Sequence, residues 1–119
     1  MKWVIVGCAV VFGTAAAVAA PVAKPPMFAI CGVCHKADAG AAAGIGPNLW
    51  GVGGRVSGTA PGYSYSSAMK AAKIKWTKPE LVAFITDPQK RVPGTKMAYG
   101  GLKNPAQADA VANYLLSLK

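Results

Sequence analysis

Apolar residues fall in one unbroken run at the start of this chain and in several short groups of helical period after it. The unbroken run covers residues 3–20, follows a single positive charge at Lys2, and becomes Ala-rich toward its end. This pattern is typical of an export signal, so residues 1–20 are expected to be a signal peptide cleaved after Ala20. The alternative is an uncleaved membrane anchor, because the run nearly reaches the ~20 residues that cross a bilayer.

Two helices are expected to bracket the folded part of the chain. The first begins at Pro26, whose fixed φ suits the first helical position. The second begins with Asn104 as N-cap and Pro105 after it. Its apolar residues recur at helical spacing and give one buried face: Ala108, Val111, Leu115 and Leu118.

Two further helices are predicted in the middle of the chain. Ser66 or Ser67 is expected to cap a short helix that runs to Lys73. Residues 77–80 read Thr-Lys-Pro-Glu and match a capping box, in which the Glu side chain returns to the N-cap backbone. The apolar helix that follows should stop before Pro88. No alternation of strands and helices is found, so the fold class is predicted to be all-α.

The part of the chain after the signal is one small domain with a strong positive charge. A proline-punctuated leader at 21–26 precedes a domain at 27–119, which is near the size at which a hydrophobic core alone gives little stability. The chain has 13 Lys and Arg against 4 Asp and Glu. No nucleic-acid recognition motif accompanies this charge, so acidic protein surfaces are the favoured partners.

Candidate chemistry is concentrated at residues 31–35, Cys-Gly-Val-Cys-His. Two thiols spaced by two residues and an adjacent imidazole are the pattern of c-type haem attachment, with thioethers at Cys31 and Cys34 and an iron ligand at His35. The alternatives are half of a zinc site and a thioredoxin-type redox pair. Zinc requires further ligands, yet His35 is the only histidine and Cys8 the only other cysteine. The redox pair requires a βαβ context that is not found.

The order of several motifs resembles class I cytochrome c, in its mitochondrial and alphaproteobacterial branch. The motifs are CxxCH at 31–35, GPNL at 46–49, GR at 54–55, PGYSY at 61–65, a tryptophan at 76 and PGTKM at 93–97. The resemblance runs from the haem motif to the C-terminus without an evident gap. It implies a small fold of roughly three to five helices wrapped around one covalently attached haem c.

The resemblance also implies roles for residues outside the attachment motif. The carbonyl of Pro47 would accept the second N–H of His35, which fixes the imidazole and raises its basicity. Buried propionates need donors around them. The residues implied for the haem pocket and its propionates are Arg55, Tyr63, Tyr65, Trp76 and Thr95.

The iron face opposite His35 requires a second ligand, and the chain has no second histidine. The candidates are Met27, Met69 and Met97, of which Met27 is too close to the motif to reach the opposite face. The resemblance implies Met97 as the axial ligand. It also marks Met69 as a departure, because the family commonly has Asn there, and Phe84 as another, because mitochondrial relatives carry Tyr.

These observations predict a soluble, monomeric one-electron carrier rather than an enzyme. Ligation by His and Met raises the reduction potential of a haem. The carrier is expected in the periplasm, where it would shuttle electrons between a quinol-oxidising complex and a terminal oxidase or reductase. The alternative location is a membrane anchor facing the periplasm. The alternative function is a haem peroxidase or small-gas binder in which Met97 is a labile ligand.

Overall fold

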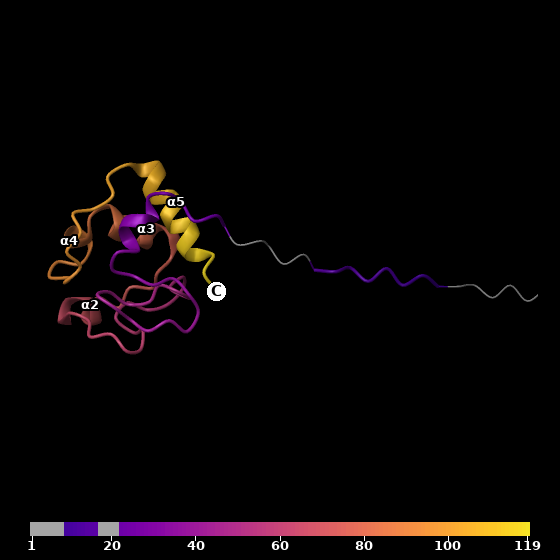
Figure 1. Cartoon of the computed structure of the whole chain (residues 1–119), viewed down its shortest axis with the longest axis horizontal. Coiled ribbons are helices and arrows are strands. Elements are labelled where there is room, and N and C mark those ends of the chain that lie inside the picture. The colour runs from indigo at the N-terminus through magenta and orange to yellow at the C-terminus, as the bar shows by residue number, and fades with distance from the viewer. Residues whose placement is uncertain (1–8, 17–21) are drawn as a thin grey trace, which may run out of the picture.

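The computed structural model describes residues 9–16 and 22–119. The described part of the chain contains five helices, and its long loops are at 32–66 and 92–104 (Figure 1). The helices are α1 (Phe28–Cys31), α2 (Ser67–Ala72), α3 (Lys78–Thr86), α4 (Pro88–Arg91) and α5 (Pro105–Leu116). Among the described residues the only β-type pairing is one isolated antiparallel bridge between Val56 and Lys75. The expected all-α class is therefore confirmed.

The N-terminal stretch is described only in part. The expected cleavage site after Ala20 lies in 17–21, and Lys2 and Cys8 lie in 1–8, so all of these fall outside the described residues. Residues 9–16 form no helix, and the side chains of Val10, Val11 and Phe12 are exposed. Within 9–16 and 22–119, no helix has the length and apolar character needed to cross a membrane.

The core forms where α5 packs against α3. Ala108, Val111 and Leu115 on α5 are buried, and Leu118 just beyond the helix is buried with them. This is the apolar face that the helical spacing predicts. The ring of Tyr114 meets Phe28 of α1 edge to face, with centroids 4.9 Å apart, so the two ends of the domain are joined at this contact.

Helix α1 is shorter than the sequence indicates. The amides of Phe28 and Ala29 bond back to the carbonyls of Pro25 and Pro26, so the chain turns before the helix begins. Met27 takes the N-cap position, where its side chain accepts no hydrogen bond. With no capping side chain at its start, the helix is a single turn that ends at the haem motif.

Two of the three predicted caps are present. Ser66 Oγ accepts a hydrogen bond from the Met69 amide at 3.1 Å, and Asn104 Oδ1 accepts one from the Gln107 amide at 3.2 Å. Both side chains satisfy an amide that the helix itself leaves free. These caps set the starts of α2 and α5 where the sequence predicts them.

The predicted capping box at residues 77–80 does not form, so this prediction is wrong. Thr77 is the N-cap of α3, but its side chain makes no capping hydrogen bond. Glu80 instead accepts from Nε of Arg91 at 2.7 Å, because a guanidinium is a stronger donor to a carboxylate than a backbone amide. The ion pair ties the end of α4 to the first turn of α3. Asp87 ends α3 and caps α4 by accepting from the Lys90 amide.

Candidate haem site

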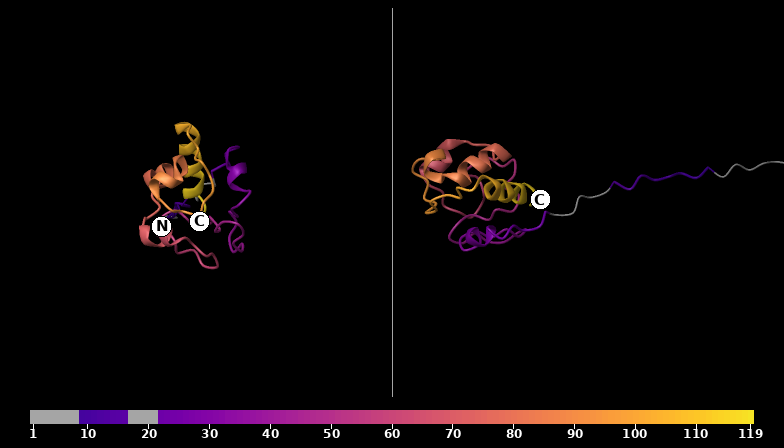
Figure 2. Two further views of the ribbon diagram at one scale, coloured as in Figure 1. Left: turned by 90° about the vertical axis from the view of Figure 1, so that its left-hand side faces the viewer. Right: turned by 90° about the horizontal axis from the view of Figure 1, so that it is seen from above.

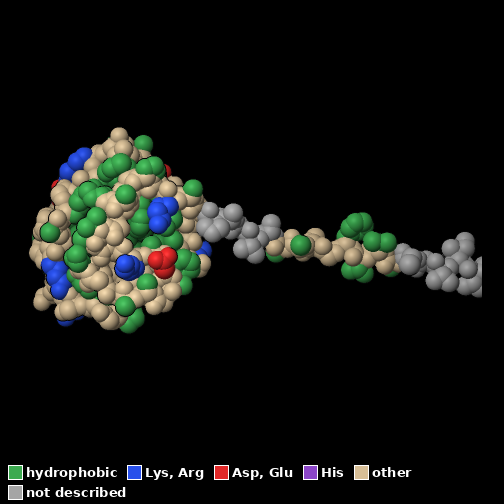
Figure 3. Space-filling model, viewed as in Figure 1, with side chains coloured by type: hydrophobic (Ala, Val, Ile, Leu, Met, Phe, Trp, Pro, Cys, Tyr) green, Lys and Arg blue, Asp and Glu red, His purple; other side chains and the backbone are tan. Residues whose placement is uncertain are grey.

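A cavity of about 430 Å³ lies between the N-terminal segment of the domain and the segments that carry α3, α5 and the loop at 93–99. The right-hand view of Figure 2 shows the purple N-terminal segment of the domain on one side and the orange and yellow segments on the other. Figure 3 shows hydrophobic side chains spread over a wide face of the domain, with Lys and Arg among them. Most of the residues that line the cavity are apolar.

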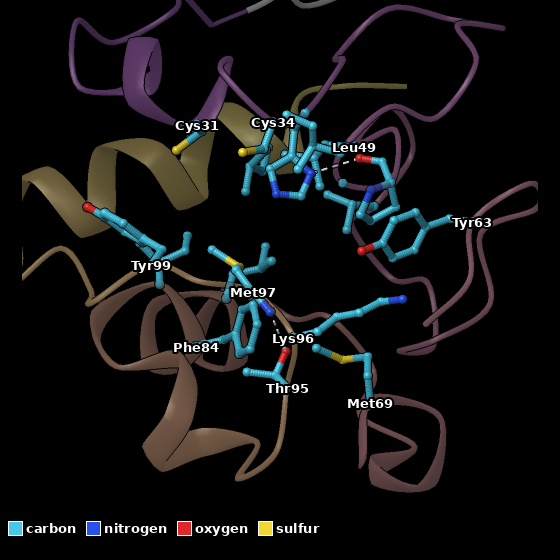
Figure 4. A pocket seen from close by; sticks show the side chains of 18 of the residues that line it. Cys31, Cys34, Leu49, Tyr63, Met69, Phe84, Thr95, Lys96, Met97 and Tyr99 are labelled. Carbon is cyan, nitrogen blue, oxygen red and sulfur yellow. Dashed lines mark hydrogen bonds between the residues drawn. The ribbon is translucent and has the colours of Figure 1, made fainter. Parts of the chain in front are cut away.

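Cys31 and Cys34 lie on one wall of this cavity (Figure 4). Cys31 is the last residue of α1, and the amides of Cys34 and His35 both bond to its carbonyl, which closes a turn through the motif. Both thiols are half-buried, and neither forms a disulfide. Burial is the main cause that raises the pKa of the Cys31 thiol, so this sulfur is protonated at neutral pH.

His35 is held with one nitrogen fixed and the other left for the cavity. Its Nδ1 lies 2.8 Å from the carbonyl oxygen of Pro47 and donates to it, which leaves Nε2 without this proton and available to a ligand. Gly46 makes this fit possible, because a Cβ there would lie 2.6 Å from the His35 Cε1 atom. Burial lowers the pKa of His35 and outweighs the opposing effect of the Pro47 hydrogen bond, so the imidazole is neutral, as a metal ligand must be.

Met97 lies at the end of the loop at 93–97 and lines the same cavity as His35, across from Cys31 and Cys34 (Figure 4). Its amide donates to Thr95 Oγ1 at 3.4 Å, which orients the residue at the loop's end. Met69 also lines the cavity and is 7% exposed. Phe84 packs beside Trp76 with ring centroids 5.2 Å apart. Two methionines therefore face the cavity, while Met27 is not among its lining residues.

Every residue predicted for the propionates lines the cavity: Arg55, Tyr63, Tyr65, Trp76 and Thr95. The Arg55 guanidinium is anchored by donating to the carbonyls of Asn48 and Trp50 at 3.2 and 3.3 Å. Tyr65 Oη accepts from the Ala60 amide at 3.2 Å, and burial is the main cause that raises the pKa of this phenol. Arg55, Tyr63 and Tyr65 are thus positioned by the loops at 46–65, Trp76 by the segment between α2 and α3, and Thr95 by the loop before Met97.

Sequence reasoning assigned no role to three residues that shape this site. Asn48 donates to the carbonyls of Asp38 and Ala41, which folds the loop after the haem motif. Lys96 places Nζ 5.0 Å from the Tyr63 ring centroid, a cation–π contact. Tyr99 lines the cavity near Cys31. An Asn after Gly-Pro and an aromatic two residues after Met97 were the available signals, but neither has a fixed meaning alone.

The donor set fits a haem c. Two thiols on one wall can form thioethers, an imidazole and a thioether that line the same cavity can ligate iron, and a guanidinium with hydroxyls can receive carboxylates. A Cβ at Gly46 would fill the space that the imidazole occupies. Among the described residues, no three His, Cys, Asp or Glu side chains form a cluster able to hold a metal ion.

Several known proteins are similar to this chain. The family model described as cytochrome c matches residues 26–119. Cytochrome c2 iso-2 of Magnetospirillum fulvum is 44% identical over 94 residues, which cover 79% of this chain and 97% of that protein. Cytochrome c2 of Rhodoblastus acidophilus is 43% identical over 99 residues, which cover 83% of this chain and 92% of that protein.

A solved structure is also similar. Cytochrome cH from Methylobacterium extorquens matches with a TM-score of 0.69 and 39% sequence identity, over 74% of this chain and 88% of that one. The chain belongs to the cytochrome c family. It is a class I cytochrome c similar to the alphaproteobacterial cytochromes c2, an electron-transfer protein with one covalently attached haem c and not an enzyme.

Proposed function

We propose that this cytochrome carries one electron at a time on a haem c that Cys31 and Cys34 attach and that His35 and Met97 ligate. The observation that carries the proposal is that His35 and Met97 line one cavity, with Met97 across it from the two cysteines and with Nδ1 of His35 fixed by Pro47. When bound, a His/Met-ligated haem supplies a one-electron couple between ferric and ferrous iron at a raised potential.

The chain's own residues keep that couple reversible. The apolar lining excludes water from the cavity, and its shape is set by helices packed through α3 and α5. The propionate groups would lie among Arg55, Tyr63 and Tyr65, with Trp76 and Thr95 completing the donors. Because backbone contacts already hold the side chains of Arg55, Tyr65 and Thr95, these groups need little rearrangement when the charge of the iron changes.

The axial assignment is tested by spectroscopy. Ferric protein should show a methionine-to-iron charge-transfer band, and Met97→Ala should abolish it. Met69→Ala is the matched control, since Met69 is the other methionine on the cavity wall, and it should leave the band in place. A band that survives Met97→Ala, or that is lost in Met69→Ala, would show that the wrong methionine has been assigned.

The proposed partners are a quinol-oxidising complex as donor and a terminal oxidase or reductase as acceptor, each with an acidic docking surface. The formal net charge of +9 supports electrostatic steering toward such surfaces. Electron-transfer rates with a natural partner should fall as salt is raised from 20 to 300 mM, in rough terms by ten-fold or more. Rates that are independent of salt would exclude steering by this charge.

Export to the periplasm is proposed from residues 1–20, followed by the leader at 21–26 and the haem domain at 27–119. The start of the family match at residue 26 supports this division. N-terminal sequencing with an intact mass of the exported protein tests both steps together. A mature chain that begins at Pro21 and carries the added mass of one haem is expected, whereas a retained N-terminus would indicate the anchored alternative.

A further inference from the structure

The loop that presents Met97 is held from outside by one amide side chain. Gln89, on α4, donates from Nε2 to the carbonyl oxygen of Thr95 at 2.8 Å. The Gly94 amide donates back to Gln89 Oε1 at 3.4 Å. Both bonds reach the loop within three residues of Met97.

The loop's other hydrogen bonds are mostly local. The Thr95 amide bonds to the Val92 carbonyl, and the Met97 amide bonds to Thr95 Oγ1. These contacts fix the shape of the turn but do not attach its outer part to a neighbouring element. Pro93, Gly94 and Lys96 are exposed. Apart from the buried Thr95 side chain and the contact of Lys96 with Tyr63, the attachment of this segment depends on Gln89.

Gln89 can hold the loop because α4 is itself fixed. Pro88 is fully buried, Asp87 caps the helix, and the Arg91 guanidinium is bonded to Glu80 of α3 at 2.7 Å. The amide therefore lies on a short helix anchored to α3 at its far end. A displacement of the loop away from the cavity would have to break the Gln89 bonds, since α4 cannot follow it.

We propose that Gln89 is a positioning residue that keeps Met97 on the iron, by binding the loop at 93–97 through its side-chain amide. The inference rests on the proposed function, in which Met97 is the axial ligand. Loss of the amide raises the fraction of molecules in which the loop has moved outward and the sixth iron position is open. Gln89 thus lowers the access of small ligands to the sixth position of the same iron.

The test measures access of imidazole to the ferric holoprotein. Gln89→Met keeps the length of the side chain but neither donates nor accepts, and it should tighten imidazole binding by about five-fold, the effect of losing one net hydrogen bond. Gln89→Glu keeps the acceptor for the Gly94 amide and loses the donor to Thr95, so it should show a similar increase. The charge-transfer band of both variants should persist without imidazole, because the closed loop stays the major state.

The matched control is Gln107→Met on α5, where the glutamine side chain makes no hydrogen bond to the described part of the chain. It should bind imidazole as the parent protein does, and denaturant midpoints will confirm that all three variants are folded under the assay conditions. Parent-like binding by Gln89→Met and Gln89→Glu would overturn the inference, as would an equal increase in Gln107→Met. A parent protein without the methionine band would instead refute the axial ligand itself, which keeps the two failures distinct.

Discussion

The His35 Nδ1 atom and the carbonyl oxygen of Pro47 lie 2.8 Å apart, across a separation of twelve residues. This hydrogen bond joins the attachment motif to the loop that follows it and fixes which imidazole nitrogen is free. The loop returns so closely that the Gly46 amide also bonds to the Cys34 carbonyl at 2.8 Å. The ligand and the loop behind it therefore form one packed unit.

Gly46→Ala should disrupt this unit. Its Cβ would lie 2.6 Å from the His35 Cε1 atom, so either the imidazole or the loop must move. We expect unfolding to become easier by about 1–3 kcal/mol, as for other overpacked sites. Gly44→Ala is the control, because the nearest atom to its Cβ would be at 3.9 Å, and it should change stability by less than about 0.5 kcal/mol. Denaturant titration compares them, and equal losses would contradict the close fit at residue 46.

Met69→Asn should lower the reduction potential. The ferric state carries one more positive charge than the ferrous state, so a polar amide in this apolar wall stabilises the ferric state more. An effect on the order of 1 kcal/mol corresponds to about 40 mV for one electron. Met27→Asn makes the same change outside the cavity and should leave the potential unaltered. A redox titration in which Met69→Asn has an equal or higher potential would refute this role for Met69.

The N-cap residues of α5 and α3 are expected to differ in how much they contribute to stability. Asn104→Ala removes the acceptor of the Gln107 amide and should cost about 1 kcal/mol of unfolding free energy. Thr77→Ala should cost far less, because the Thr77 side chain caps nothing. Thermal unfolding of the two variants measures the difference. Similar losses would mean that Thr77 does cap α3 in solution.

The Glu80–Arg91 pair should make stability fall in acid. The hydrogen bond from Arg91 is the main cause that lowers the pKa of Glu80 below its ordinary value. A carboxyl with a lowered pKa in the fold stabilises it above the unfolded pKa, and that contribution is lost as pH falls through the folded pKa. Unfolding midpoints at pH 7 and pH 3 should therefore differ less in Glu80→Gln than in the parent.

Arg91→Gln provides the check on this pH effect. It should reduce the acid sensitivity as Glu80→Gln does, and the double variant should add little further. If Glu80→Gln reduces the acid sensitivity but Arg91→Gln does not, the Glu80 carboxylate interacts with a group other than Arg91. If neither variant does, the pair contributes nothing to the pH dependence.

The sequence predicted those features that depend on local chemistry. Ser66 and Asn104 cap their helices because a cap needs only a side-chain oxygen near amides two or three residues on. The haem-attachment motif at 31–35 was likewise predicted from the types and spacing of neighbouring side chains. The Glu80 half of the predicted capping box is absent because the Glu80 side chain accepts from Arg91, eleven residues later, a contact that depends on the packing of α4 against α3.

Features that depend on tertiary structure could not be predicted from the sequence pattern. Met69 and Met97 both line the cavity, so the residue spacing alone could not choose between them. Gln89 is an ordinary exposed residue in the sequence, and its role appears only when its amide is found on the carbonyl of Thr95. Every predicted donor for the propionates lines the cavity, and this set of residues was predicted from motif order rather than from any property of a single residue.

His35 is the only histidine in the chain, and its proposed role as an iron ligand therefore also affects how the protein refolds. An unfolded chain with the haem attached presents no other imidazole that could compete with Met97 for the vacant iron position. At neutral pH its lysine amines are largely protonated and compete poorly. Refolding from denaturant should therefore lack the slow phase that release of a misplaced imidazole would impose. Refolding with the haem attached would then involve no species in which a wrong histidine is bound to the iron.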